Sequence, residues 1–193
     1  MQKIFLVDLF VSGGPVMIPI VICSVIALAI VIERLRFYHR NPNNGAAFMK
    51  KVRSAFITRN YMDAMKICRS ENTPLANVIA AGIDHLDLSK EHILDVMRQE
   101  AMVQVKKYER HLGKLATIAS ITPLLGLTGT VTGMISSFAV ISTVGIGDPT
   151  ALAGGISEAL YTTAAGLMVG IPALVAHNWC EAKSLEFVEQ VEM

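Results

Sequence analysis

Two long stretches in the C-terminal part of the sequence contain no charged residue. The first covers 33 positions, residues 115–147, and the second covers 22 positions, residues 159–180. A helix needs about 20 apolar residues to cross the hydrocarbon core of a bilayer. The pattern therefore predicts two membrane helices joined by a short polar turn at residues 144–150, with only Asp148 and Glu158 charged between the two runs.

The N-terminal part of the sequence predicts a further membrane helix. Residues 1–11 are mostly apolar but carry Lys3 and Asp8, which favours a short amphipathic helix in the membrane interface over a cleaved signal peptide. Glycines and a proline break this segment, and residues 15–32 then form an uncharged run. Arginines follow that run, so the positive-inside rule puts its end in the cytoplasm and the N-terminus outside, with three spans in total: Arg34, Arg36 and Arg40.

Residues 46–113 carry most of the charge and are patterned for helices. Thr73 followed by Pro74 marks a break, and residues 75–83 form a short apolar helix after it. Ser89 is a predicted helix start, because its hydroxyl can cap the helix and an acid follows in the first turn. From there apolar residues recur every three or four positions without a glycine or proline cluster. This predicts one long helix, partly cytoplasmic and partly in the membrane, along Leu94, Met97, Ala101, Val105, Tyr108, Leu112, Leu115 and Ala119.

Composition agrees with the membrane class. The 193 residues are 52% hydrophobic, only 17% are charged, and the mean hydropathy is +0.48. The net charge of +1 hides an uneven distribution, since 14 of the 17 lysines and arginines lie within residues 34–110. That distribution bears on topology and gives no indication of nucleic-acid binding. Three cysteines without paired spacing predict neither a disulfide framework nor a metal site, and no nucleophile arrangement or phosphate loop indicates an enzyme or a cofactor.

Small and hydroxyl side chains gather on one face of each C-terminal span. At helical spacing, the face of the second span holds Pro123, Gly126, Thr130, Met134 and Ser137. The face of the third span holds Ala159, Thr163, Gly166 and Gly170. Two interpretations compete. Small residues let helices approach closely while threonines bond to a carbonyl one turn back, or the threonines of several subunits form polar rings in an apolar pore. Periodicity alone favours packing.

Glu158 also has two interpretations. An acid at the start of a spanning helix favours the positive end of the helix dipole. An acid inside the membrane instead indicates an ion path or a charged partner. Glu158 and Thr163 lie about 140° apart around a helix, so they need not line the same surface of one subunit.

The sequence LLGLTGTVTGM at residues 124–134, followed by Phe138, resembles the signature of the MotA/TolQ/ExbB proton-channel family. The resemblance is closest to the ExbB/TolQ branch. Residues 14–35 resemble the first span of that branch more loosely, and the charged middle matches only in length and helical character. The third span matches at Gly155, Ile156, Ser157, Glu158, Ala159, Leu160, Thr163, Gly166, Leu167, Ile171, Pro172, Ala173 and Asn178.

The resemblance implies a bacterial inner-membrane protein that assembles as a ring, usually a pentamer, with the second and third spans around a pore. Single membrane helices of an ExbD/TolR-like partner, each with an aspartate, would lie inside it, and a TonB/TolA-like protein would be driven. Thr130 and Thr163 match the pore threonines, and Glu158 matches the family's acid. The titrating carboxylate then belongs to the partner, and the threonine hydroxyls can hydrogen-bond its protonated form or solvate its ionised form without placing a fixed charge in the membrane.

The sequence thus predicts an all-α membrane protein with three transmembrane helices, long helices extending into the cytoplasm and a ring-forming homo-oligomer. We expect an interfacial helix and first span at residues 1–40, a cytoplasmic helical region at 41–113, and pore-lining spans with a short cytoplasmic tail at 114–193. The predicted function is a proton-channel subunit that couples proton-motive force to mechanical work such as protein transport. A non-conducting scaffold for partner helices is the alternative. A flagellar-type stator is less favoured, because the MotA branch has four spans.

Overall fold

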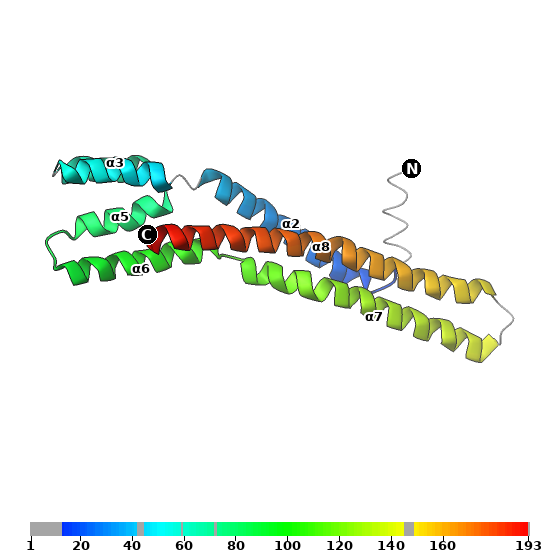
Figure 1. Ribbon diagram of the computed structural model, residues 1–193. Helices are drawn as coiled ribbons and strands as arrows, with labels where there is room; N and C mark the ends of the chain where they lie inside the picture. Colours follow the sequence, from blue (N-terminus) through cyan, green and yellow to red (C-terminus); the bar gives the residue numbers. More distant parts are fainter. Residues whose placement is uncertain (1–12, 42–44, 59, 72, 145–148, 193) are drawn as a thin grey trace. The chain divides into compact units, whose positions relative to one another are not determined.

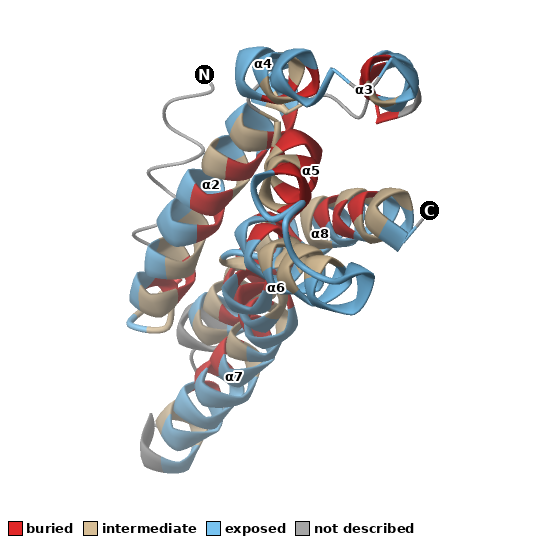
Figure 2. Ribbon diagram, turned by 90° about the vertical axis from the view of Figure 1, so that its left-hand side faces the viewer, coloured by how far each residue is buried: buried red, intermediate tan, exposed pale blue. Residues whose placement is uncertain are grey.

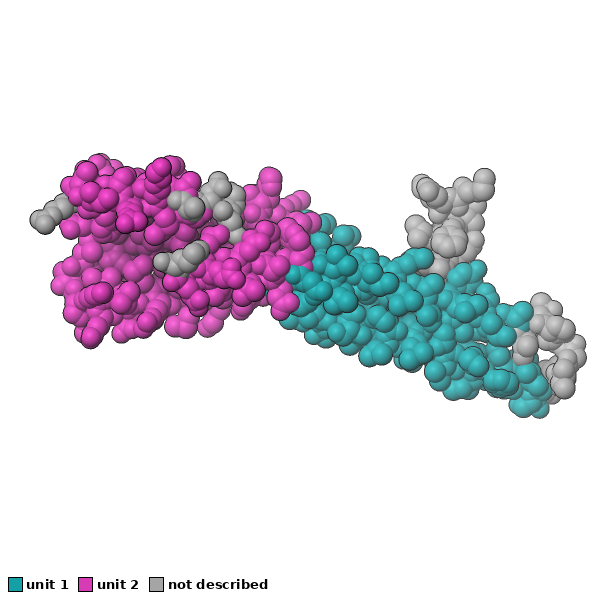
Figure 3. All heavy atoms as spheres, in the orientation of Figure 1, with its two compact units in different colours: residues 1–33, 111–178 teal, residues 34–110, 179–193 magenta. Residues whose placement is uncertain are grey.

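All regular structure in the described part of the chain is helical. The computed structural model describes residues 13–41, 45–58, 60–71, 73–144 and 149–192. These residues form the seven helices α2 to α8 (Figure 1). They fall into two compact units, residues 1–33 with 111–178 and residues 34–110 with 179–193 (Figure 3). The interfacial helix expected at residues 1–11, and most of the turn expected at 144–150, lie outside the described residues.

Three of the described helices are long and apolar enough to cross a membrane, as predicted. The uncharged runs of the sequence lie in these three helices, α2 (Met17–Arg40), α7 (Leu112–Val144) and α8 (Pro149–Glu192). Proline suits the first turn of a helix, which explains why α8 begins earlier than its apolar run. The helix continues past its apolar run to Glu192, because residues 180–192 contain no glycine or proline to stop it.

The first unit is built from α7, from most of α2, and from α8 up to Asn178. One buried cluster joins Ala27 and Ile30 of α2 to Leu115 of α7 and Ala173 of α8. A second cluster joins Met17 and Ile20 to Ala165. Small residues at these contacts bring the helices close together. The outward faces carry large apolar side chains that are more than half exposed, which suits contact with lipid or with other chains: Ile18, Val25, Ile135, Leu160 and Val175.

The long helix predicted from Ser89 into the membrane is broken. Its start is confirmed, because Ser89 caps α6 (Lys90–Tyr108) and its Oγ accepts from the His92 amide at 3.5 Å. The continuation is wrong, because α6 ends at Tyr108 and α7 begins at Leu112. His111 between them has φ 65°, a left-handed conformation that does not continue a right-handed helix.

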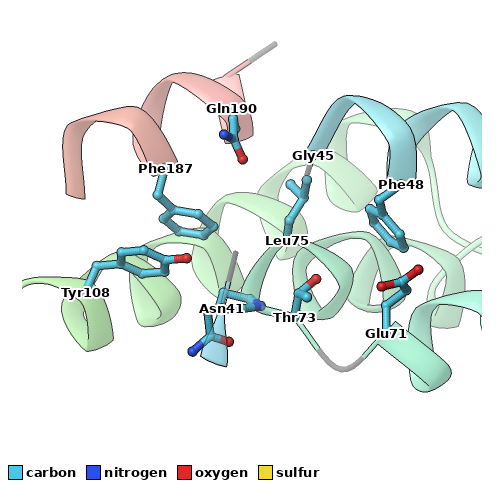
Figure 4. Close-up of a pocket in the computed structure, with 10 residues that line it drawn as sticks. Asn41, Gly45, Phe48, Glu71, Thr73, Leu75, Tyr108, Phe187 and Gln190 are labelled. Carbon is cyan, nitrogen blue, oxygen red and sulfur yellow. The ribbon is translucent and has the colours of Figure 1, made fainter. Parts of the chain in front are cut away.

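The second unit surrounds a short buried helix, α5 (Pro74–Asp84). This helix confirms the segment predicted at residues 75–83, and Thr73 caps it through a bond from the Ala76 amide to Oγ1 at 3.3 Å. Figure 2 shows α5 as mostly buried, while α3 (Gly45–Ile57) and α4 (Tyr61–Glu71) have large exposed faces. The last part of α8 joins this unit, where Phe187 stacks on Tyr108 with ring centroids 4.2 Å apart (Figure 4).

Candidate pore-lining hairpin

The two C-terminal spans, α7 and α8, lie against each other through glycines. A Cβ added to Gly126 would lie 2.9 Å from the carbonyl oxygen of Thr162, and one added to Gly166 would lie 2.7 Å from that of Thr122. Real Cβ atoms do not approach backbone atoms so closely. The helix backbones therefore meet at a distance that only glycine permits, which is the small-residue packing of membrane helices.

The same contact continues toward the turn between the helices. A Cβ on Gly133 would lie 2.8 Å from the carbonyl oxygen of Gly155 and 3.1 Å from Cβ of Ala159. Ser137 is buried beside Gly155, and its hydroxyl donates to the Gly133 carbonyl at 3.0 Å. At the other end, Gly170 packs against the Pro123 ring. Most of the residues predicted from the two small faces are therefore brought together within one chain.

Met134 is the exception on the α7 face. Its side chain is 50% exposed in the single chain, so it does not share the contact that buries Gly126 and Ser137. An exposed methionine flanking the hairpin is available to another chain or to lipid.

Both predicted pore threonines are half-buried, and both donate to carbonyls of α7. The Thr163 hydroxyl donates to the Gly126 carbonyl across the hairpin at 3.2 Å. The Thr130 hydroxyl donates to the Leu127 carbonyl within α7 at 2.6 Å. A hydroxyl has one proton and two acceptor lone pairs. With the proton committed to the backbone, each hydroxyl oxygen presents acceptor capacity to a neighbouring group.

Two fully buried threonines were not assigned a role from the sequence. Thr122 of α7 donates to the Ile118 carbonyl at 2.5 Å, and Thr162 of α8 donates to the Ala159 carbonyl at 2.9 Å. Thr162 packs on Gly129. The signal that could have found Thr162 is the pair of glycines one turn apart on α7, Gly129 and Gly133, which marks a second contact row beside that of Gly126.

Glu158 lies well inside α8. It is the tenth residue of a helix that begins at Pro149, and the first turn of α8 holds no acid. The interpretation of Glu158 as a helix-start acid is therefore wrong, because the dipole effect is confined to the first turn. Its half-buried carboxylate lies beside Gly14, where an added Cβ would overlap Oε1. Thr163 instead faces Gly126, so Glu158 and Thr163 contact different parts of the first unit.

The described residues offer no metal centre, since they contain no group of three His, Cys, Asp or Glu side chains close enough to hold an ion. Between Leu115 and Cys180, the described side chains and backbone of the hairpin offer hydroxyl oxygens, backbone carbonyls and the carboxylate of Glu158.

Comparison with known proteins identifies a family and several relatives of this chain. Residues 70–193 match the model of the MotA/TolQ/ExbB proton channel family. An ExbB-like biopolymer transport protein of Synechocystis sp. is 34% identical over 174 residues, covering 88% of this chain and 68% of that protein. The biopolymer transport protein ExbB of Neisseria meningitidis serogroup A is 28% identical, covering 88% of this chain and 84% of its own length.

A third relative comes from the Tol system. The Tol-Pal system protein TolQ of Pseudomonas aeruginosa is 28% identical over 193 residues, covering 90% of this chain and 82% of that protein. The relatives are ExbB and TolQ proteins, in agreement with the branch predicted from residues 124–134. With its match over nearly two thirds of its length, this multi-pass membrane chain belongs to the MotA/TolQ/ExbB proton channel family.

Proposed function

We propose that the chain is the ring-forming subunit of a proton-driven motor in the bacterial inner membrane, with its N-terminus periplasmic and its C-terminus cytoplasmic. In this proposal α7 and α8 of several copies, five by analogy with the family, surround a pore. Single-span helices of an ExbD/TolR-like partner lie in the pore, and their motion drives a TonB/TolA-like protein. The resemblance of residues 124–134 and 155–178 to the family signature supports this arrangement.

One observation about the hairpin carries the proposal, namely where the two threonine hydroxyls direct their protons. Thr130 and Thr163 donate to the carbonyls of Leu127 and Gly126, which are adjacent residues of α7. Both hydroxyl oxygens are therefore left as acceptors at neighbouring levels of the hairpin. An acceptor oxygen receives a hydrogen bond from a protonated carboxylic acid, whereas a carboxylate has no proton to give.

This geometry favours a protonated partner acid next to the threonines. A neutral acid with a hydrogen-bond acceptor is far cheaper to hold in a membrane than an unpaired carboxylate. The ring thus stabilises the proton-loaded form of the partner while the acid passes through the apolar part of the pore. Glu158 lies elsewhere in the first unit, and we propose that it contributes a separate ionisable group on the proton path.

Proton flux in vesicles tests the proposal. The complex of this chain with its partner is reconstituted, and flux is measured for wild type, Thr163→Val and Thr163→Ser. We expect Thr163→Val to abolish partner-dependent flux while the complex still assembles, and Thr163→Ser to retain it, because serine keeps the hydroxyl. Thr130→Val with Thr130→Ser gives the matched pair on α7. Flux at the wild-type level in both valine variants would contradict the polar-ring role.

A non-conducting scaffold is the second candidate, and the glycine packing of α7 on α8 favours it. Close packing of Gly126 and Gly166 needs no pore to explain it. A scaffold would hold partner helices but pass no protons, so wild-type vesicles would show no flux above empty vesicles. Proton flux that persists when the partner's membrane aspartate is replaced by asparagine would contradict the proposal that the partner carries the titrating carboxylate while this chain supplies the threonine hydroxyls.

A further inference from the structure

The second unit contains a groove of about 370 Å³ between the end of α2 and the part of α8 that follows Asn178. Its volume lies in the range of small-ligand sites. The inner wall is formed by Tyr38, which is 8% exposed. A neighbouring hollow, lined in part by Asn41 and Phe187 (Figure 4), has only about 50 Å³ and has room for a few waters.

The walls of the groove combine apolar and cationic side chains. Leu35 and Trp179 line it and are 48% and 42% exposed, so large apolar surfaces face its opening. His39 and Lys183 line it as well and supply cationic or hydrogen-bond-donating groups. Asn41 adds an amide. A ligand that suits these walls has an anionic head and an apolar body.

The position of the groove along the chain identifies the source of such a ligand. Leu35 and His39 belong to the last turns of α2, a helix long and apolar enough to cross a membrane. Tryptophan is typical of the membrane interface, where its ring lies at the level of the lipid headgroups. Basic residues next to a span attract anionic lipids. A soluble phosphate compound would use the cations but not the exposed Leu35 and Trp179 surfaces.

We propose that this groove binds the headgroup of an anionic phospholipid. The phosphate lies at Lys183 and His39, and the glycerol and upper acyl chain lie against Leu35 and Trp179. This inference goes beyond the proton-channel function and stands without it, since it requires only that the chain lies in a membrane.

An ion pair of Lys183 opposes binding of the lipid phosphate and gives a further test of the proposal. Lys183 Nζ is held by the Glu186 carboxylate at 2.8 and 3.0 Å. Both side chains are partly exposed, so this pair is weak and its lysine can turn to another anion. The phosphate must therefore compete with Glu186 for the same ammonium group. Removing the Glu186 charge is expected to strengthen lipid binding, whereas removing the Lys183 charge is expected to weaken it.

Trp179 provides the measurement, because it is the single tryptophan of the sequence and lines the groove. The full chain is reconstituted in phosphatidylcholine vesicles that contain brominated phosphatidylglycerol or brominated phosphatidylcholine at equal amounts. Quenching of Trp179 fluorescence by each lipid gives the local preference for the anionic headgroup. We expect phosphatidylglycerol to quench more strongly than phosphatidylcholine in wild type.

Three variants distinguish a defined lipid-binding site in the groove from general attraction of anionic lipid to surface charge. Lys183→Gln should reduce the preference about fivefold, the effect of one basic residue at an anionic surface. Arg36→Gln is the matched control, since Arg36 is an exposed cation on α2 that does not line the groove. The preference of this variant for phosphatidylglycerol over phosphatidylcholine should stay near that of wild type. Glu186→Gln should raise the preference.

The proposal is overturned by equal quenching by the two lipids in wild type, or by equal losses in Lys183→Gln and Arg36→Gln. The quenching measurement is also repeated with millimolar inorganic phosphate in the buffer. If phosphate alone abolishes the preference, the groove is a site for a soluble phosphate and the lipid assignment is wrong. Circular dichroism of each variant checks that the helices remain formed.

Discussion

The Tyr38 hydroxyl donates to the carbonyl of Tyr108, the last residue of α6, at 2.9 Å. One turn earlier on α2, the Arg34 guanidinium donates to the Lys107 carbonyl at 2.8 Å. The last carbonyls of a helix have no amide partners within it. Two side chains of α2 thus cap the C-terminus of α6, and the same Tyr38 hydroxyl also lies 3.3 Å from the Cys180 carbonyl of α8.

Tyr38→Phe tests this cap. The variant keeps the ring that packs edge-on against Trp179 at 5.6 Å, but it removes the hydroxyl bond to the Tyr108 carbonyl and leaves that carbonyl only the longer bond from Arg34 at 3.4 Å. We expect the free energy of unfolding of the solubilised protein to fall by about 1–2 kcal/mol. Thermal unfolding followed by circular dichroism measures the change. Tyr61→Phe is the matched control, because Tyr61 is 45% exposed and its ring pairs only with Phe56 among the described aromatic contacts. An equal loss in both variants would exclude the cap.

Gly166→Ala should separate α7 from α8. The added methyl would lie 2.7 Å from the Thr122 carbonyl and 3.1 Å from the Gly126 Cα, and backbone atoms cannot move aside as a side-chain end can. Overpacking of this kind costs about 1–3 kcal/mol. Gly113→Ala is the matched control on α7, where no atom lies within 4 Å of the added Cβ. Alanine favours helix there, so the control should be neutral or stabilised by up to about 1 kcal/mol.

The readout for this pair is the melting temperature of the solubilised complex together with its size in gel filtration. A drop for Gly166→Ala that Gly113→Ala does not share supports the close approach of the two spans. Equal melting temperatures would mean that the hairpin opens at little cost.

Cys68 provides a dependence of stability on pH. Its side chain is buried in α4, and burial raises the pKa of the thiol above its ordinary value. A group whose pKa is raised on folding stabilises the fold below its unfolded pKa, about 8.5, and this contribution is lost as pH rises above that value. The stability difference between wild type and Cys68→Ala should therefore narrow between about pH 7 and about pH 10. Thermal melts across this range check it, and a difference that stays constant would show that the thiolate is tolerated.

The sequence predicted the elements whose causes are local. Uncharged runs of sufficient length located α2, α7 and α8, while the break at Thr73 and Pro74 and the hydroxyl of Ser89 located the starts of α5 and α6. The break at residues 109–111 has no such local signal, because that segment contains neither glycine nor proline. Its support comes from Arg34 and Tyr38, more than 65 residues away along the chain. Caps made by distant side chains do not appear in a hydrophobic pattern.

The candidate site was predicted in the same partial way. Periodicity placed Gly126 and Thr163 on small faces, and the structure brings these two residues into contact. Periodicity could not tell which small residues meet the other helix and which remain exposed, as Met134 does, because that depends on how the two faces are rotated. The interpretation of Glu158 depends on where α8 begins. The sequence around Asp148 and Pro149 did not fix this position, because a proline is compatible both with a turn and with the first turn of a helix.

Gly14→Ala is the sharpest probe of Glu158. Gly14 has φ 63°, where a residue with a Cβ is strained by about 1–2 kcal/mol, and the added Cβ would also overlap Glu158 Oε1. The variant should therefore both destabilise the protein and displace the carboxylate. Combining it with Glu158→Ala removes the overlap and leaves only the backbone strain. We expect the two losses of stability to be non-additive, with Gly14→Ala costing less in the Glu158→Ala background. Melting temperatures of the four proteins measure the coupling. Proton flux of Gly14→Ala should fall with that of Glu158→Gln if this carboxylate lies on the path, whereas wild-type flux in Glu158→Gln would remove Glu158 from it.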